Sequence, residues 1–469
     1  MIAARPFYCL ARVTLEALSA HGIHSGQGDA THDVLLVRDA NGLPALPGSS
    51  LAGVLRHAYR ERHGQQASGR LFGQFGEQAQ PSWLSVSWGL VHDSRNRPCE
   101  GLLDETELQD PLLALLQDSK PLVRQRVRLE HTGAASEGGK FDVTLIPAGV
   151  RYTAWLGYWC DDSDESRQHW QDLLALLGGA PLLLGHGIRS GNGHFRVHSL
   201  AQARWDLRSA QGRQAYVNRP RSRRDSHGLQ PLQSAAGQQA TLQVELTLQA
   251  EAGWRIGGGE RSLNTHEKPP ALLPQHEFCV QWQNEQAHLG EHYHLLPGSA
   301  LKGALRHRVA YHYRCLTGDF AGMGGTPETE ACPAVIELFG SAENDQGVAG
   351  LLLFQDLRLQ GNSTVLMHNR IDRFTGGVID GALFSEEVLW QTPLTLRIGT
   401  LHPQRLAQVD GLARQALQRA LEDLASGWLP LGAGGSRGLG VFSDPSARGP
   451  QWSDGGAWIN SAATLEASA

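Results

Sequence analysis

The sequence has little lysine, widely scattered cysteine and no long apolar run. Only four lysines stand among its 41 basic residues, so arginine supplies the other 37, and the formal net charge over 469 residues is −6. The six cysteines form no C-x-x-C pair, which argues against a disulfide framework and for a reducing compartment. No apolar stretch reaches about 18 residues and no apolar signal core is present, which excludes the membrane and secreted classes. We therefore expect a cytoplasmic protein.

The chain is long and rich in arginine. At about 100–200 residues per domain, its length predicts two or three domains with cores of their own. Its mild acidity argues against a protein that binds nucleic acid over its whole surface. The planar guanidinium group nevertheless suits bidentate contacts to phosphate. Codon usage in a GC-rich genome would produce the same bias, so composition alone does not identify a partner.

The clearest feature of the sequence is an internal repeat. The segment LPGSSLAGVLRH at 46–57 recurs as LPGSALKGALRH at 296–307, and a glycine-rich loop at 185–195 recurs at 432–442. Within each half the two motifs are separated by nearly the same length of chain. This matched spacing indicates a tandem duplication. We therefore expect a first domain at 1–204, a second domain at 239–443, a basic linker at 205–238 between them and a flexible tail at 444–469.

Each copy of the first motif predicts the start of an amphipathic helix. Ser49 is a suitable N-cap, and Leu51, Leu55 and Tyr59 follow at helical spacing. The free amide groups at such a start attract anions, and basic side chains one turn apart lean back toward them. An ordinary amphipathic helix explains a single copy, whereas two copies favour phosphate binding. The candidate residues are Gly48, Ser49, Ser50, Arg56 and Arg60 in the first copy and Gly298, Ser299, Lys302 and Arg306 in the second.

The glycine-rich loops are the second candidate site. Small residues at alternate positions permit close approach of a backbone or ligand, and Arg189 and Arg437 add positive charge. Tight turns use glycine for the same reason, so one such loop is weak evidence for binding. Neither loop fits the phosphate-binding pattern G-x-x-x-x-G-K-[ST], which argues against a nucleoside triphosphate site.

Taken together, these motifs resemble the RAMP superfamily of CRISPR proteins. The resemblance rests on L-P-G-S-[SA]-L-x-G-x-L-R, the segments from Arg128 and Arg370 that read R-[IL]-[DE] before T-G, and the closing glycine loops. It is greatest to backbone subunits of type III effector complexes. It implies an α+β fold of two tandem RRM-like (ferredoxin-like) domains with thumb insertions, in which His131, Arg370 and Arg373 contact RNA. The implied partners are CRISPR guide RNA, single-stranded target RNA and other type III subunits, with no membrane.

The resemblance also implies a cleavage site. In backbone subunits that cut target RNA, a catalytic aspartate precedes a short strand and the turn into P-G-S, and Asp33 occupies that position here. We expect a strand at 34–37 and a turn at Asn41-Gly42. A single carboxylate can hold a divalent cation, Mg or Mn, or accept a proton from an attacking 2′-hydroxyl. Asp29 is the neighbouring alternative carboxylate, and Arg38, His32 and Arg56 are alternative groups for stabilising the developing charge.

The second half departs from this pattern, because no aspartate stands at the matching position. Glu277 is the nearest carboxylate, but it lies farther ahead of its P-G-S motif than Asp33 does. We therefore expect the second domain to bind RNA without cutting it.

Two other functional classes remain open at this point. One is a purely structural RNA-binding subunit, and the other is a guide-processing ribonuclease that would use a histidine such as His24 or His57. A structural zinc site is not expected: the side chains that could bind it are His307, His312, Cys315 and Cys332, and their spacing contains no C-x-x-C.

Overall fold

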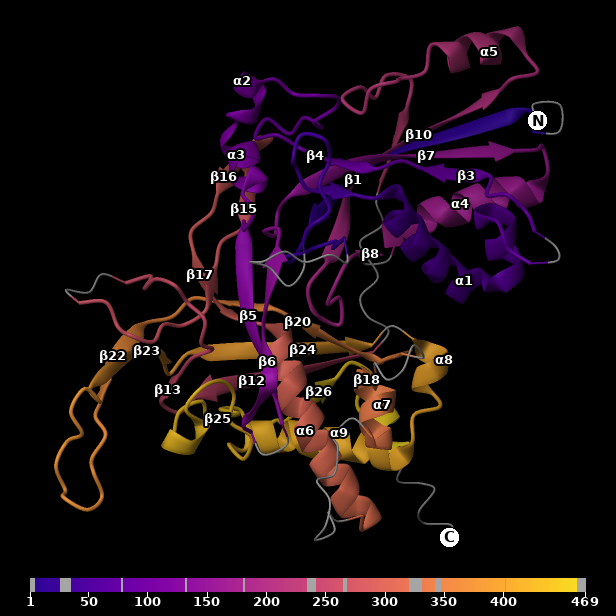
Figure 1. Ribbon diagram of the computed structural model, residues 1–469. Coiled ribbons are helices and arrows are strands. Elements are labelled where there is room, and N and C mark those ends of the chain that lie inside the picture. Colours follow the sequence, from indigo (N-terminus) through magenta and orange to yellow (C-terminus); the bar gives the residue numbers. More distant parts are fainter. Residues whose placement is uncertain are drawn as a thin grey trace.

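Two lobes follow one another along the chain (Figure 1). The computed structural model describes residues 5–25, 35–76, 79–130, 133–179, 182–233, 242–264, 268–319, 331–341, 347–400 and 402–461. Asp29, Asp33 and His131 lie outside these residues. Among the described helices, none is long and apolar enough to cross a membrane.

The first lobe is built on an antiparallel sheet with two helices on one face. Strand β1 (Phe7–Ala17) lies between β10 (His194–Asp206) and β7 (Arg151–Cys160), and β3 (Leu84–Val86) and β4 (Gly89–Val91) pair with β7. Helix α1 (Gly48–Phe72) follows β1, and α4 (Asp164–Gly179) follows β7. The chain order β-α-β-β-α-β is that of a ferredoxin-like domain.

The second lobe repeats this arrangement. Its sheet has the order β25-β12-β24-β20, with helix α6 after β12 and helix α9 after β24. The bounds are β12 (Leu242–Ala250), α6 (Gly298–Thr317), β20 (Leu352–Gln355), β24 (Pro393–Thr400), α9 (Gly411–Ala425) and β25 (Phe442–Ser443). The predicted α+β class with two RRM-like domains is therefore confirmed.

Long hairpins extend from both sheets and form the predicted thumb insertions. The first thumb, β5 (Leu122–Leu129) and β6 (Ala135–Leu145), runs from the first lobe down to the second (Figure 1). The second thumb, β22 (Ser363–His368) and β23 (Phe384–Trp390), projects away from the second lobe. A shorter hairpin, β15 (Val280–Gln283) and β16 (Gln286–Leu289), reaches from the second lobe back to the first.

The remaining elements are short. They are β2 (Ala45–Leu46), α2 (Glu105–Leu108), α3 (Pro111–Gln117), β8 (Leu182–Leu183), β9 (Ser190–Gly191), α5 (Ala210–Val217), β11 (Gln230–Leu232), β13 (Gly253–Trp254), β14 (His276–Glu277), β17 (Tyr293–Leu296), α7 (Pro333–Phe339), β18 (Gly340–Ser341), β19 (Val348–Ala349), β21 (Leu357–Leu359), α8 (Pro403–Leu406), η2 (Gly435–Arg437), β26 (Gln451–Trp452) and α10 (Ala457–Asn460).

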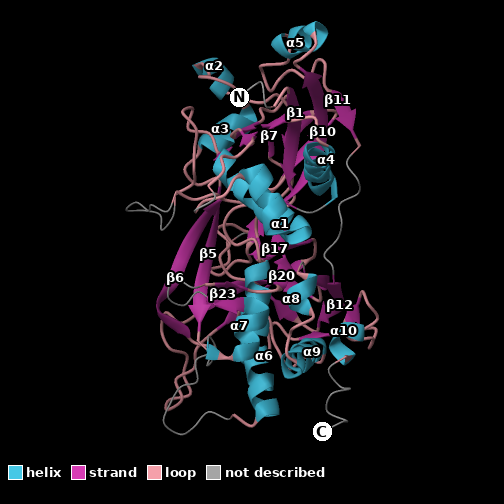
Figure 2. Cartoon of the chain, turned by 90° about the vertical axis from the view of Figure 1, so that its right-hand side faces the viewer, coloured by secondary structure: helices cyan, strands magenta, loops and turns pink. Residues whose placement is uncertain are grey.

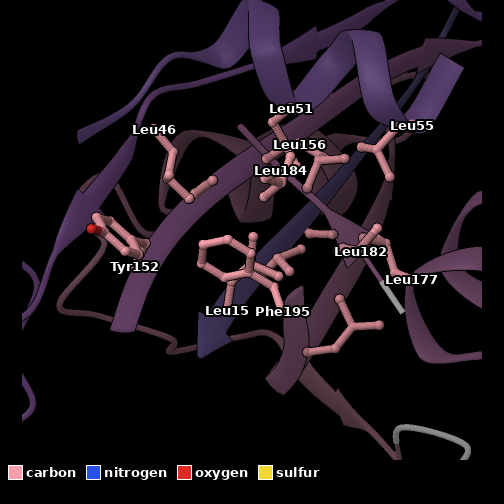
Figure 3. Close-up of a cluster of buried hydrophobic side chains, with 14 of the residues drawn as sticks. Leu15, Leu46, Leu51, Leu55, Tyr152, Leu156, Leu177, Leu182, Leu184 and Phe195 are labelled. Atoms are coloured by element: carbon pink, nitrogen blue, oxygen red, sulfur yellow. The ribbon is translucent and has the colours of Figure 1, made fainter. Parts of the chain in front are cut away.

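Each lobe has its own apolar core. In the first, α1 packs Leu51, Leu55 and Tyr59 against the sheet, as their spacing predicted, and each is at most 1% exposed. Figure 3 shows Leu51 and Leu55 in this core. In the second, β12 alternates between a buried face and a polar face, as a strand covered on one side should. Full burial of one such leucine side chain contributes about 1.5–3 kcal/mol. Each lobe is therefore a unit with its own core, and the two meet through the hairpins and through the pairing of β9 with β20.

The helix start in each P-G-S motif lies earlier than predicted. Helix α1 begins at Gly48 with Pro47 at the N-cap, and α6 begins at Gly298 with Pro297 at the N-cap. The predicted N-cap, Ser49, therefore lies inside the helix, and neither start has a side-chain cap from its own N-cap residue. Proline's fixed φ matches the extended backbone before each helix, which explains the shift.

The predicted linker is folded onto the first lobe, and this is a correction. Between 205 and 233 the chain forms α5 and then β11, which pairs with β10. Trp205 and Tyr216 pack with Tyr8, Trp155 and Trp159 over the sheet face opposite α1. The segment is thus a cover for an aromatic face, a role that local periodicity could not reveal.

Several arginines of this segment are also engaged within the protein. Arg208 pairs with Asp206 at 2.8 Å, and Arg223 pairs with Glu100 at 2.9 Å. Arg219 stacks on the Tyr216 ring at 4.0 Å. These contacts anchor the segment rather than leaving a free basic arm.

The predicted tail and the strand at 34–37 also need correction. Through residue 461 the tail is folded: β26 pairs with β12, and Trp458 of α10 is buried against the second core. In the described part of 34–37, Leu36 makes only an isolated bridge to His24. The turn at Asn41-Gly42 is present, with Gly42 at φ +74° and the amides of Asn41 and Leu43 bonded to the Asp39 carboxylate.

Candidate nucleic-acid interface

A buried arginine joins the two lobes. Arg124, on the first thumb, is buried and donates to both carboxylate oxygens of Glu277, at 2.5 and 2.9 Å. It also donates to Asp356 at 2.7 Å and to Asn192 at 2.8 Å. Its two carboxylate partners come from the second lobe, so the contact fixes the lobes relative to each other. These charges keep the pKa of Arg124 above its usual value despite burial.

Glu277 is therefore not available for chemistry. It was the nearest carboxylate to the missing second catalytic position, but it is only 3% exposed and both oxygens face Arg124. Its position beside the first thumb makes it a structural residue of the junction.

The first glycine-rich loop is part of the same junction. Its strand β9 adds in parallel to β20 of the second sheet. Gly191 has φ +101°, and a Cβ there would lie 1.9 Å from Oδ1 of Asp356. The close approach that glycine permits in this loop is thus to the protein's own second domain.

The same aspartate occupies the start of helix α6. Asp356 Oδ1 accepts a hydrogen bond from the Gly298 amide at 2.8 Å. The carboxylate already fills the anion position at this helix start, which corrects the prediction that Gly298 and Ser299 cradle a phosphate. In α1 the start has no capping side chain, and Gly48 allows close contact with the Val86 carbonyl.

Three of the predicted cations gather beside this junction. Lys302 and Arg306 lie one turn apart on α6, which packs against β9 of the first lobe. Burial, together with repulsion from Arg306 and Arg189, lowers the pKa of Lys302 to about 8. Like charges held this close are destabilising by themselves and favour an added anion. This cluster, Arg189, Lys302 and Arg306, is the candidate phosphate-binding surface.

The cluster continues toward helix α1 of the first lobe. Arg189 donates to the Gly350 carbonyl at 2.7 Å and lies 3.3 Å from His402, which pairs with Glu61 of α1 at 2.8 Å. On α1, Arg60 is exposed and Arg56 is half-buried. Figure 2 shows α1 above α6 along one side of the molecule. The structure therefore brings the two P-G-S helices to the same side of the chain.

The remaining predicted cations lie elsewhere. Arg370 and Arg373 are exposed in the loop of the second thumb, where Arg373 stacks on Phe374, itself 83% exposed. Arg437 pairs with the fully buried Glu386 at 3.2 Å, so its charge is already balanced within the second domain.

The predicted cleavage residue Asp33 and its alternatives Asp29 and His32 lie outside the described residues, whereas the residues on either side are described. The Ser25 amide donates to the Leu35 carbonyl at 2.9 Å, so the chain enters and leaves segment 26–34 at one point. Arg38, one of the candidates for charge stabilisation, donates to the backbone carbonyls of Gly42 and Leu116 at 2.6 and 2.7 Å. That guanidinium is therefore committed to structure. His57, a candidate for guide processing, pairs with Glu61 at 3.4 Å.

No metal centre is assembled by the described residues, since no three His, Cys, Asp or Glu side chains meet there in a suitable group. Of the zinc candidates, His312 lies 2.6 Å from the Asp423 carboxylate, Cys332 is buried and Cys315 is exposed. The residues that sequence reasoning missed are Arg124, Asp356 and Glu386. Only the paired glutamates at 386–387 in an apolar strand gave a signal, since buried carboxylates need partners.

The comparisons with known proteins agree with this duplicated architecture. The model of the RAMP superfamily matches residues 14–196 and again residues 247–443. The chain therefore belongs to the RAMP superfamily and carries the family's unit twice. No curated protein matches it.

Among solved structures, the chain is similar to subunits of type III-B Cmr-beta complexes. One, from the apo state, shares 12% identity over 40% of this chain and 96% of that chain, with a TM-score of 0.32. Another, from the complex bound to cognate target RNA, shares 16% identity over 42% of this chain and 60% of that chain, with a TM-score of 0.29.

Proposed function

We propose that this protein is a backbone subunit of a type III CRISPR effector ribonucleoprotein and that it binds guide RNA through both domains. Membership of the RAMP superfamily and the duplicated RRM-like unit support this function. So do the exposed aromatic and arginine side chains of the second thumb, because aromatic rings and guanidinium planes stack on unpaired bases. Its partners would be guide RNA, single-stranded target RNA and the other subunits of the complex.

The observation that carries the proposal is the cluster of Arg189, Lys302 and Arg306. Burial, and after it repulsion from Arg306 and Arg189, lowers the pKa of Lys302 to about 8. An RNA phosphate between them would remove this repulsion and release counterions. The cluster also lies where the two lobes meet, so one strand bound there could contact both domains.

Removing two of these charges is expected to weaken RNA binding. For Lys302→Gln with Arg306→Gln, the salt dependence of log affinity should fall by about 1.4, since each phosphate contact to a single strand contributes about 0.7. Fluorescence anisotropy of a labelled single-stranded RNA over a salt series measures this slope. Arg397→Gln, which removes an exposed arginine paired with Glu245, is the matched control and should leave the slope unchanged. An unchanged slope in the double variant would reject the cluster as an RNA site.

Raising the pH from about 7 to about 9 is expected to weaken RNA binding by up to about tenfold. The free protein loses the Lys302 proton as the pH passes its pKa of about 8, and only the ammonium form attracts phosphate. Binding should therefore be strongest below this pKa and decline above it. Lys302→Gln should bind more weakly at pH 7 and lose this part of the pH dependence. A variant that keeps the full decline would show that another group titrates.

We further infer that the first domain cleaves target RNA through Asp33, with Mg²⁺ or Mn²⁺, and that the second domain does not cut. Magnesium is commonly held by one or two carboxylates together with substrate phosphates, so a single aspartate suffices to bind it in the presence of RNA. The bound cation would stabilise charge on the reacting phosphate. The engagement of Glu277 by Arg124 supports a second domain without cleavage chemistry. Cutting assays on complexes that carry Asp33→Ala test this assignment.

A further inference from the structure

A pair of histidines lies beside the first glycine-rich loop. The rings of His24 and His186 are 5.6 Å apart between centroids and meet edge to face. His186 is held by its amide, which donates to the Gly22 carbonyl at 2.9 Å, and its side chain is exposed. Nε2 of His24 lies 3.0 Å from the Thr144 carbonyl oxygen and donates to it. The His24 ring is therefore held by the backbone of the first domain, and the His186 ring lies beside it at the surface.

Arg126 of the first thumb lies close to this pair. Burial, and after it the charges of Arg126 and His24, lower the pKa of His186 below the usual value. The Arg126 side chain is half-buried, and its Nε and Nη2 atoms are buried without a hydrogen-bond partner. Unpaired buried guanidinium donors are costly, and the usual remedy is an anion.

The second domain shows how the duplicated position is normally balanced. Arg126 faces Phe141 across the first thumb, and His368 faces Phe384 at the same place in the second. His368 pairs with the buried Glu386 at 2.6 Å. In the second thumb, Glu386 faces Leu366 across the hairpin. At the corresponding position of the first thumb, Val143 faces Arg124.

The histidines are likewise confined to the first copy. The Gly22 carbonyl accepts from the His186 amide, and the corresponding Arg255 carbonyl accepts from the Ala433 amide at 2.9 Å. In the second copy, Ala433 therefore corresponds to His186. Gly257, two residues after Arg255, corresponds to His24, two residues after Gly22. At these matched positions the second copy has a buried carboxylate, Glu386, and no histidine pair, whereas the first copy has His24, His186, Arg126 and a valine.

We propose that His24, His186 and Arg126 form a binding site for one phosphodiester group of an RNA strand, present in the first domain only. This site rests on the proposed function, since RNA supplies the anion. The guanidinium of Arg126 offers donors that no described residue uses, and the exposed His186 ring offers a further N–H. The phosphate would supply the negative charge that Glu386 supplies beside His368 in the second domain.

The first test is direct RNA binding by the full-length chain. The probe is a fluorescein-labelled oligouridylate, followed by anisotropy. Arg126→Gln is expected to lower affinity about tenfold, the effect of losing one charge-assisted hydrogen bond, and to reduce the salt slope by about 0.7. His186→Ala, a change at an exposed side chain that should leave folding intact, is expected to lower affinity about threefold. His288→Ala removes an exposed histidine outside the site and is the matched control.

The outcomes separate this site from the function on which it rests. If the unaltered chain binds the oligouridylate and both variants bind equally well, the site is wrong while the proposed function stands. If the unaltered chain binds no RNA under any salt condition, the proposed function fails and the site fails with it. Should Arg126→Gln not fold, His186→Ala alone decides.

A footprint on the assembled complex identifies the source of the phosphate. Diethyl pyrocarbonate modifies exposed histidines, and mass spectrometry reads out His186 against His288. Protection of His186 in the guide-loaded complex before target is added assigns the phosphate to guide RNA. Protection that appears only with target assigns it to target RNA. A His186 that remains reactive in both states overturns the proposal.

Discussion

Replacing Arg124 with alanine is expected to destabilise the protein by about 3–5 kcal/mol, the usual effect of removing one partner from a buried ionic contact. The substitution would leave Glu277 and Asp356, at 3% and 8% side-chain exposure, without their shared cation. It would also remove the donor to Asn192, so three polar groups at the junction lose a partner at once. Because these groups join the two lobes, we expect the two lobes to separate when the protein loses this stability.

Urea unfolding followed by tryptophan fluorescence measures this effect. The matched control is Arg397→Ala, whose exposed pair with Glu245 should contribute no more than about 1 kcal/mol. A second variant, Arg124→Met combined with Glu277→Gln and Asp356→Asn, should recover much of the lost stability because no buried charge is left unpaired. Equal midpoints for Arg124→Ala and Arg397→Ala would contradict the assignment of Arg124 as the joining residue.

Replacing Asp33 with alanine is expected to reduce target-RNA cutting by at least about 100-fold, the lower range for losing a group that positions a metal or transfers a proton. Guide RNA should remain bound, because Asp33 is not among the residues assigned to RNA binding. The measurement is single-turnover cleavage of labelled target by the complex assembled with its neighbouring subunits. Cutting that is unchanged by Asp33→Ala would favour a purely structural subunit.

Two further measurements distinguish the alternatives for cleavage. Asp29→Ala tests the other carboxylate of the same segment, and loss of cutting in that variant alone would move the assignment to Asp29. Chelation by EDTA should stop target cutting if a divalent cation is required. Cutting of repeat RNA that survives EDTA and stops on His24→Ala would instead identify a guide-processing enzyme.

The fold could be predicted from sequence to the extent that its signals are local or repeated. The duplicated P-G-S and glycine-rich motifs located both domains, and the spacing of Leu51, Leu55 and Tyr59 identified the face of α1 that is buried. The segment at 205–233, which packs over the aromatic face of the first sheet, could not be predicted in this way. The aromatic residues that meet there, such as Tyr8 and Trp205, are brought together from distant parts of the chain by strand pairing.

The candidate site was predictable only in part. Lys302 and Arg306 were identified because they recur one helical turn apart, and Arg189 because it lies in a repeated loop. Nothing in the sequence indicated that Asp356 would occupy the start of α6, because that carboxylate reaches Gly298 from the position between β20 and β21, 58 residues away in the chain. Asp33 remains a prediction that rests on its position before the P-G-S motif.

The contact made by Arg124 also bears on how long an assembly of this chain can grow. A head-to-tail contact between successive copies of one unit propagates into an open fibre if every copy carries both complementary surfaces. Here the second thumb carries Leu366 at the strand position of Arg124, and Glu386 stands opposite it instead of Val143. Among the described residues, the contact of Arg124 with Glu277 and Asp356 therefore has no counterpart in the second thumb. The second thumb therefore cannot form the same contact with a third unit. Any longer assembly of this chain must use chemically different surfaces.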